Sequence, residues 1–133
     1  EERIHNLSIG EKVKLAYRGS QEDRRLLIRD PNQIVSSAVV KSGRLTPPEV
    51  ITYARNPHMS GAVVREIARN KAMLRTYPVK VALVKNPKTP LSVAMRLLQQ
   101  LQRRDLQALT NSRAVPAAIM KAARQTYRQR YLH

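Results

Sequence analysis

A three-residue motif occurs three times in this chain and predicts where its secondary-structure elements end. A basic residue, then Asp or Asn, then proline stand at residues 29–31, 55–57 and 85–87. The residue before a proline avoids the helical conformation, so each copy is expected to end a helix. An apolar stripe at helical spacing follows each copy, so each copy is also expected to precede a new helix.

The motif recurs at nearly regular intervals, which indicates a repeat architecture. With Asn111 as a fourth anchor, the intervals from Asp30 onward are 26, 30 and 25 residues. Each interval holds two short helical patterns, and short helices are marginal in water unless they pack on neighbours. We therefore expect an all-α fold, a right-handed α-solenoid of short paired helices. An irregular helical bundle with chance Asn-Pro turns is the alternative.

Capping signals place the helix boundaries. Ser8 with Glu11, and Thr46 with Glu49, have the spacing of a capping box. Gly19 is expected to end the first helix in a left-handed conformation. Further helix starts are expected at Ser20, Ser60, Pro78, Thr89-Pro90, Asp105 and Pro116.

The length of 133 residues suits a single domain. We expect N-terminal capping helices at 1–29, repeats at 30–125 and a C-terminal tail at 126–133. The 30-residue interval implies an insertion around residues 72–77. The first residue is Glu rather than Met, so we expect a fragment or a processed chain. No apolar run is long enough to cross a bilayer and no signal peptide is visible, so we expect a cytoplasmic protein without integral membrane association.

The repeat resembles that of the bacterial leucine-rich repeat variant proteins, a branch of the HEAT-like α-solenoids. Residues 86–90, Asn-Pro-Lys-Thr-Pro, are similar to that family's N-P-x-T-P-like turn, and Asn56-Pro57 matches it with Ser60 in place of Thr-Pro. The resemblance covers roughly residues 28–125 and implies pairs of short helices. It implies little about function, because such solenoids serve many partners.

Residue content argues against most catalytic and metal-binding chemistry. There is no cysteine, so thiolate metal sites and cysteine nucleophiles are excluded. The three histidines are far apart in sequence, and neither a G-x-S-x-G motif nor a phosphate-binding glycine loop occurs. We expect a non-enzymatic protein with no cofactor and no metal.

The charge balance indicates an anionic partner. The chain has 25 Lys and Arg against 9 Asp and Glu, a net charge of +16. Many of these cations, Arg24 and Arg124 among them, have few acidic neighbours in sequence. Unpaired positive charge repels itself and attracts nucleic acid, anionic lipid or acidic protein. Five tyrosines are the only aromatic residues, so platforms for stacking unpaired bases are few.

Basic residues precede the expected turns at regular places. If the helices alternate in direction, Arg29, Arg55 and Lys85 share one edge of the stack, and Lys41 and Arg69 share the other. The candidate anion-binding residues are Arg29, Lys41, Arg55, Arg69, Lys85, Lys88 and Arg113. A second explanation needs no ligand, because a cation near a helix C-terminus stabilises the helix dipole by about 0.3–1 kcal/mol.

The expected function is binding of an anionic partner, with nucleic-acid backbone first and without strong sequence specificity. The alternative is a protein–protein interaction scaffold that grips an acidic peptide or domain. Exposed apolar side chains within a basic groove would favour the scaffold, and their absence would favour nucleic acid. A small anionic ligand such as a nucleotide, held where a helix N-terminus meets an arginine, is a third option. The sequence does not indicate an oligomeric state.

Overall fold

The computed structural model describes residues 2–132, and the expected all-α fold is confirmed. These residues form ten α-helices and one short 3-10 helix, without a strand. The α-helices span Glu2–His5 (α1), Ile9–Arg18 (α2), Gln21–Leu27 (α3), Gln33–Lys41 (α4), Pro47–Arg55 (α5), Gly61–Arg69 (α6), Tyr77–Lys85 (α7), Leu91–Leu98 (α8), Arg103–Leu109 (α9) and Ala117–Tyr131 (α10), and the 3-10 helix spans Met73–Arg75 (η1). No helix among residues 2–132 has both the length and the apolar character that a bilayer span requires.

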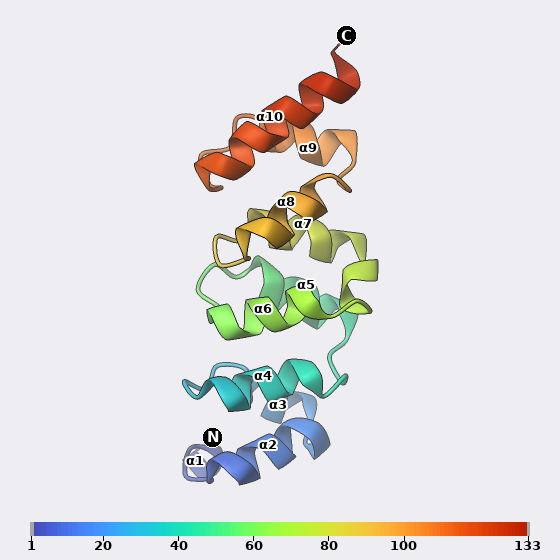
Figure 1. Ribbon diagram of the computed structural model, residues 1–133. Helices are drawn as coiled ribbons and strands as arrows, with labels where there is room; N and C mark the ends of the chain where they lie inside the picture. Colours follow the sequence, from blue (N-terminus) through green and yellow to red (C-terminus); the bar gives the residue numbers. More distant parts are fainter. Residues whose placement is uncertain (1, 133) are drawn as a thin grey trace.

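The helices are stacked in chain order, with the two termini at opposite ends (Figure 1). Along one side of the stack run α2, α4, α6, α8 and α10, and behind them run α3, α5, α7 and α9. On the first side α2 packs against α4 and α4 against α6, while α5 packs against α7 on the second. In these three pairs, helices that are not consecutive in the chain become neighbours.

A single apolar core runs through the stack. The apolar stripes expected from the sequence supply its buried side chains. Members from successive helices with no more than 1% exposure include Leu27, Val39, Ile67, Leu83, Leu98, Leu106 and Ile119. Each buried side chain of this size contributes about 1.5–3 kcal/mol relative to exposure, which stabilises helices too short to persist alone.

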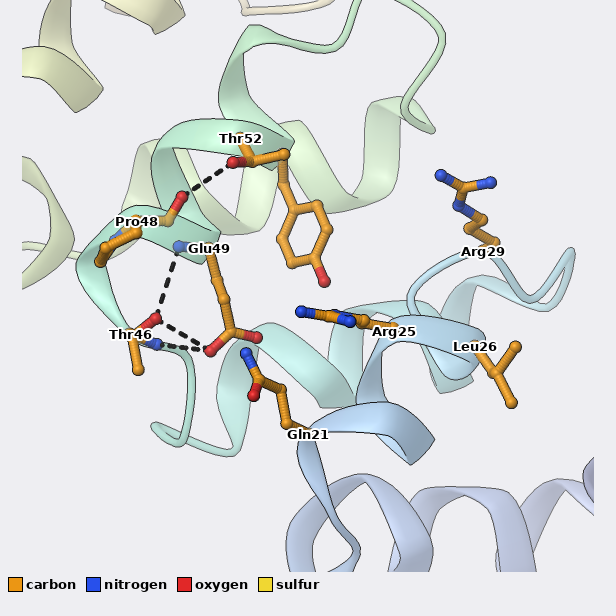
Figure 2. A pocket seen from close by; sticks show the side chains of 9 residues that line it. Gln21, Arg25, Leu26, Arg29, Thr46, Pro48, Glu49 and Thr52 are labelled. Atoms are coloured by element: carbon orange, nitrogen blue, oxygen red, sulfur yellow. Dashed lines mark hydrogen bonds between the residues drawn. The ribbon is translucent and has the colours of Figure 1, made fainter.

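Both expected capping boxes are present. In α2 the Ser8 hydroxyl accepts from the Glu11 N–H at 3.1 Å, and the Glu11 carboxylate accepts from the Ser8 N–H at 3.0 Å. In α5 the Glu49 carboxylate accepts from the Thr46 N–H at 3.1 Å (Figure 2). The hydrogen bond that the Ser8 N–H donates to the Glu11 carboxylate also holds the pKa of Glu11 below its usual range. These helix starts are therefore fixed by local side-chain chemistry.

Gly19 ends α2 as expected, but not in the conformation that the sequence suggested. Its φ of −78° is extended rather than left-handed. Glycine is required there for space, because a Cβ would lie 2.6 Å from the Leu15 carbonyl oxygen and from the Asp23 carboxylate. The left-handed glycine within residues 2–132 is Gly43, with φ 71°, in the turn after α4.

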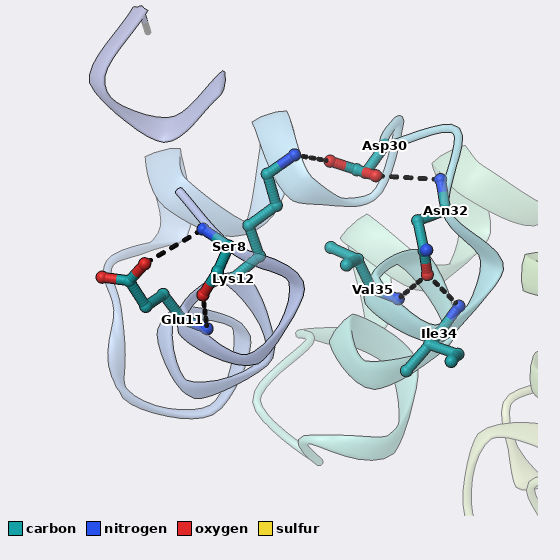
Figure 3. A network of polar contacts seen from close by, with 7 residues as sticks. All are labelled: Ser8, Glu11, Lys12, Asp30, Asn32, Ile34 and Val35. Carbon is teal, nitrogen blue, oxygen red and sulfur yellow. Dashed lines mark hydrogen bonds and ion pairs between the residues drawn. The ribbon is translucent and has the colours of Figure 1, made fainter. Parts of the chain in front are cut away.

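The repeated motif forms the same turn in each copy. One side-chain oxygen of Asp30, Asn56 and Asn86 accepts a hydrogen bond from the backbone N–H two residues further on, at 2.9 Å in all three cases. Asp and Asn favour this turn, and the proline between them and the donor cannot continue the helix. The first copy, beside the ion pair to Lys12, is visible in Figure 3.

The anchor residue of the turn also joins successive layers. The Asn86 amide donates to the carbonyl oxygens of Ala54 at 2.8 Å and Asn56 at 3.3 Å, both at the end of α5. The Asp30 carboxylate accepts from the Lys12 Nζ of α2 at 2.7 Å (Figure 3). In its first and third copies the motif therefore both ends a helix and attaches that end to the preceding layer.

Two later repeat positions differ from the simple pattern. The insertion expected around residues 72–77 is the 3-10 helix η1 between α6 and α7. At the fourth anchor the turn uses Ser112, whose hydroxyl accepts from the Ala114 N–H at 3.3 Å, in place of an Asn. Thr89 does not cap α8, because its hydroxyl donates to the Leu83 carbonyl oxygen at 2.6 Å.

Helix α10 continues through most of the expected C-terminal tail. Residues 126–131 are helical, because the last two turns pack against α9. Tyr127 and Tyr131 lie 5.1 Å apart between ring centroids, and the Arg103 guanidinium lies over the Tyr131 ring at 4.9 Å. Such contacts hold a helix end that would otherwise fray.

Tyr77 links α7 to α9, and its removal gives a testable loss of stability. Its hydroxyl donates to the Asp105 carboxylate at 2.6 Å and accepts from the Gln102 N–H at 2.8 Å. Burial first, and then the bond to Asp105, raise the pKa of Tyr77 above 10.0. The folded protein thus holds this proton more tightly than the unfolded chain. Its stabilisation is complete below the unfolded pKa and is lost as pH rises through the folded pKa.

We expect Tyr77→Phe to lower the free energy of unfolding by about 1–2 kcal/mol at pH 7, because the half-buried Asp105 carboxylate and the Gln102 N–H each lose a hydrogen bond. The penalty should shrink above a pH of about 10, where the phenol of the unfolded chain begins to ionise, and vanish once the folded phenol has ionised as well. Urea denaturation at pH 7 and in alkaline buffer measures both effects. An equal penalty at both pH values would contradict the assigned role of the phenolic proton.

Candidate anion-binding surface

The structure brings three predicted cations to one edge of the stack. Arg55 and Lys85 are the last residues of α5 and α7, and the ends of these two helices are joined by the Asn86 amide. Arg29 lies in the tightened turn after α3, two residues beyond the end of that helix. All three side chains are exposed. We call Arg29, Arg55 and Lys85 the basic edge.

A cleft lies between the first two turns of this edge. Its volume is about 540 Å³, and Arg29 and Asn56 both line it. Its other polar lining comes from Asp30, Gln33, Ser36, His58 and Ser60. The cleft therefore offers hydrogen-bonding groups beside a cation, and we call it the edge cleft.

The basic edge has no acidic partner within residues 2–132. The Lys and Arg residues that form ion pairs in this part of the chain are Lys12, Arg25, Lys41 and Arg69. The chain carries 25 such residues in total, so most of its positive charge is uncompensated at close range. Uncompensated charge is available to an anionic ligand.

The opposite row of predicted residues is partly neutralised. Lys41 Nζ and Arg69 Nη2 lie 3.8 Å and 3.1 Å from the same Glu66 oxygen. The Glu66 side chain is only 15% exposed, so its charge is held in place between them. Exposed pairs of this kind stabilise by about 0–1 kcal/mol, but they lower the local positive potential. The two rows are therefore electrostatically different.

The remaining predicted residues, Lys88 and Arg113, have different surroundings. Lys88 Nζ donates to the Met59 carbonyl oxygen at 2.5 Å, so this amine joins two successive turns. Arg113 is exposed in the connection between α9 and α10. Lys88 thus stabilises the packing of the turn after α7 against the turn after α5.

Several arginines elsewhere stabilise helix ends. Arg24 is only 6% exposed, and its guanidinium donates to the Gly19 carbonyl oxygen at 2.8 Å. Arg24, which was expected to have few acidic partners, forms no ion pair within residues 2–132 but is buried, so it does not add to the exposed positive charge. Arg124 likewise donates to the Thr110 carbonyl oxygen, at 2.7 Å. For these residues the carbonyl groups at a helix C-terminus explain the positive charge without a ligand.

A larger cavity of about 690 Å³ lies beside the edge cleft and shares Arg29 with it. Arg25 and Arg29 come from the α3 side, and Glu49 and Tyr53 come from α5 (Figure 2). Sequence reasoning did not identify this site. The four-residue spacing of Arg25 and Arg29, which would place two residues on one face if the helix continued to Arg29, was the available signal; in the structure α3 ends at Leu27.

The electrostatics of this cavity are mixed. Burial raises the pKa of Tyr53, the Glu49 charge raises it further, and the nearby Arg25 and Arg29 charges oppose the rise. A phenol with a raised pKa remains protonated at neutral pH and can donate a hydrogen bond. The cavity therefore combines cations, a neutral donor and a carboxylate.

Comparisons of the chain with protein-family models, curated proteins and solved structures find no match. Within residues 2–132, no three His, Asp or Glu side chains are grouped so that they could hold a metal ion. The function of the chain therefore has to be argued from its own surface.

Proposed function

We propose that this chain is a right-handed, HEAT-like α-solenoid that binds nucleic-acid backbone through the basic edge, without catalysis. One observation carries the proposal: cations from three successive layers stand at one edge and have no acidic partner within residues 2–132. Stacked helix pairs are the arrangement in which such an edge forms, because equivalent positions of successive repeats are aligned.

The distribution of apolar side chains favours nucleic acid over an acidic protein. The large exposed hydrophobic residues within residues 2–132 are Ile9, Tyr17, Ile34, Leu91 and Leu132. None of them lines the edge cleft or the larger cavity. Protein interfaces centre on buried aromatic and apolar anchors, whereas phosphate contacts need cations and polar groups. The edge cleft is lined by Ile28, Pro31 and Met59 as well as by polar groups, so the proposal rests on its cation and hydrogen-bonding groups, which suit phosphate.

The proposed mechanism is exchange of counterions for protein cations. Each Lys or Arg that neutralises a phosphate releases condensed counterions, and this release drives binding. Contacts to phosphate carry no base information, so the expected preference among sequences is weak.

Salt dependence of binding tests the proposal. Three phosphate contacts at the basic edge should give a log–log slope of affinity against salt of about −3 on duplex DNA, and extra contacts should make it steeper. Fluorescence anisotropy with duplex DNA, duplex RNA and poly-glutamate measures the slope, beside a control protein of equal net charge. If poly-glutamate binds as tightly as the duplexes, the acidic-peptide scaffold becomes the better explanation. If the control protein matches the affinity on every polymer, net charge alone accounts for binding.

A further inference from the structure

The edge cleft lies where the second copy of the turn makes no bond to the first. In the third copy the Asn86 amide donates to the Asn56 carbonyl oxygen at 3.3 Å and joins the third turn to the second. Asn56 has the same place in the second copy, but its amide donates to no group within residues 2–132. His58 stands where the third copy has Lys88, whose amine donates to the Met59 carbonyl oxygen. The shorter His58 side chain makes no hydrogen bond within the same residues, and a cleft of about 540 Å³ remains.

Side chains that line this cleft offer hydrogen-bond donors that are not used. They are Arg29, Asn56, His58 and Ser60. Arg29 makes neither an ion pair nor a side-chain hydrogen bond within residues 2–132. The Ser60 hydroxyl accepts from the Val63 N–H at 3.3 Å, so its own proton can still be donated. Arg29 and His58 are exposed, and Asn56 and Ser60 are half-buried, so a ligand in the cleft can reach these groups.

The carboxylate that lines the cleft is already satisfied. Asp30 Oδ2 pairs with Lys12 Nζ at 2.7 Å, and Asp30 Oδ1 accepts from the Asn32 N–H at 2.9 Å (Figure 3). The Asp30 side chain is only 9% exposed, and Lys12 compensates its charge. The cleft therefore presents several unused donors beside an uncompensated cation. An oxyanion accepts several hydrogen bonds at once, so this lining suits a phosphate group.

We propose that the edge cleft binds a phosphate group of the nucleic-acid backbone through Arg29, Asn56, His58 and Ser60. This inference rests on the proposed function and assigns one of its phosphate contacts to a particular place. Asn56 and Ser60 are uncharged, so the contact depends on their hydrogen bonds as well as on the charge of Arg29.

The decisive variant is Asn56→Asp. Aspartate already forms this turn in the first copy, where Asp30 accepts from the Asn32 N–H, so the turn should be kept. The amide donor is replaced by a carboxylate, which repels an oxyanion. Sulfate is the probe, because its charge stays the same across the range of about pH 5 to 8 in which histidine titrates. We expect sulfate affinity to fall about tenfold or more in an NMR titration at constant ionic strength.

Asn70→Asp is the matched control for this variant. Asn70 is also half-buried, its side-chain oxygen accepts from the Met73 N–H at 3.1 Å, and it lies at the far end of α6 from Ser60. Sulfate affinity should change by less than about twofold, because charges at this separation are screened. Equal losses in the two variants would overturn the proposal, since net charge would then explain both. Wild-type protein without a localised shift of the cleft residues at about 100 mM sulfate would overturn it as well.

His58 should make the contact sensitive to pH, because histidine gains a positive charge as the pH falls from about 8 to 5. The charged groups around His58 are Arg29 and Asp30 across the cleft, Arg55 at the end of α5, and Lys88 in the next turn. We expect sulfate to bind about three- to tenfold more tightly at about pH 6 than at about pH 8. His58→Gln should remove this dependence, and a dependence that persists in the variant would contradict the role of His58.

Competition with duplex DNA tests whether the phosphate belongs to the polymer. Added duplex should displace sulfate from the cleft, and Asn56→Asp should weaken duplex binding more than Asn70→Asp does. If duplex binds and leaves the sulfate signals unchanged, the cleft holds no backbone phosphate and this inference alone is wrong. If sulfate binds and duplex does not, the proposed function is wrong and the cleft is a site for a free phosphate.

Discussion

Replacing Asn86 with alanine is expected to lower the free energy of unfolding by about 2–4 kcal/mol, a large effect for one polar residue. The side chain is 5% exposed and takes part in three hydrogen bonds. Alanine would leave the buried Ala54 carbonyl oxygen without its donor and would free the Lys88 N–H in the turn. Both the attachment of α7 to α5 and the end of α7 would be weakened. Urea denaturation followed by circular dichroism measures the loss.

Asn56→Ala is the matched control for this change. Asn56 has the same place in the preceding turn, but within residues 2–132 its side chain makes only the local bond from the His58 N–H at 2.9 Å. Its loss should cost about 0.5–1 kcal/mol, the contribution of one ordinary hydrogen bond. Equal losses for the two variants would show that the bonds between layers add nothing to stability.

The second large effect is expected from charge removal at the basic edge. Replacing Arg29, Arg55 and Lys85 together with Gln should weaken duplex binding about 10- to 100-fold near 100 mM salt and lower the salt slope by up to about 3. The physical reason is that three layers lose their phosphate-facing cations at once. Anisotropy titration across a range of salt concentrations gives both quantities.

A second triple variant with the same charge change controls for net charge. Lys41, Arg69 and Arg113, replaced together with Gln, should weaken binding clearly less, because two of these cations are already compensated by Glu66. Equal losses in the two triple variants would show that only total charge matters. If the basic-edge variant binds normally and melts at a lower temperature, these cations serve the helix dipoles instead.

The helices could be predicted because their signals are local. Ser8 and Glu11 are three residues apart, and the bonds that make them a cap form within a single turn. The anchor residues Asp30, Asn56 and Asn86 act in the same way, since each accepts from its own turn. Hydrogen bonds between residues two or three positions apart can be predicted from the sequence, because the spacing along the chain already brings the two partners together.

What could not be predicted depends on which helices meet. Arg24 resembles any surface arginine in sequence, and only the folded chain shows that it is buried beside Gly19. Glu49 was correctly interpreted as a cap, but the burial of its second oxygen, beside a cavity that Gln21 and Arg25 of α3 also line, depends on the tertiary structure. The neutralising role of Glu66 also requires α4 and α6 to lie side by side.

The attachment of the Asp30 and Asn86 turns to the layers before them has a consequence for any long ligand. Helices here contact mainly those of adjacent layers, so distant layers are coupled only through the ones between them. In such an array separate segments can open independently. A rigid polymer bound to Arg29, Arg55 and Lys85 would contact three segments at once and oppose the opening of each. The free energy of unfolding of the protein should therefore be higher when the polymer is bound.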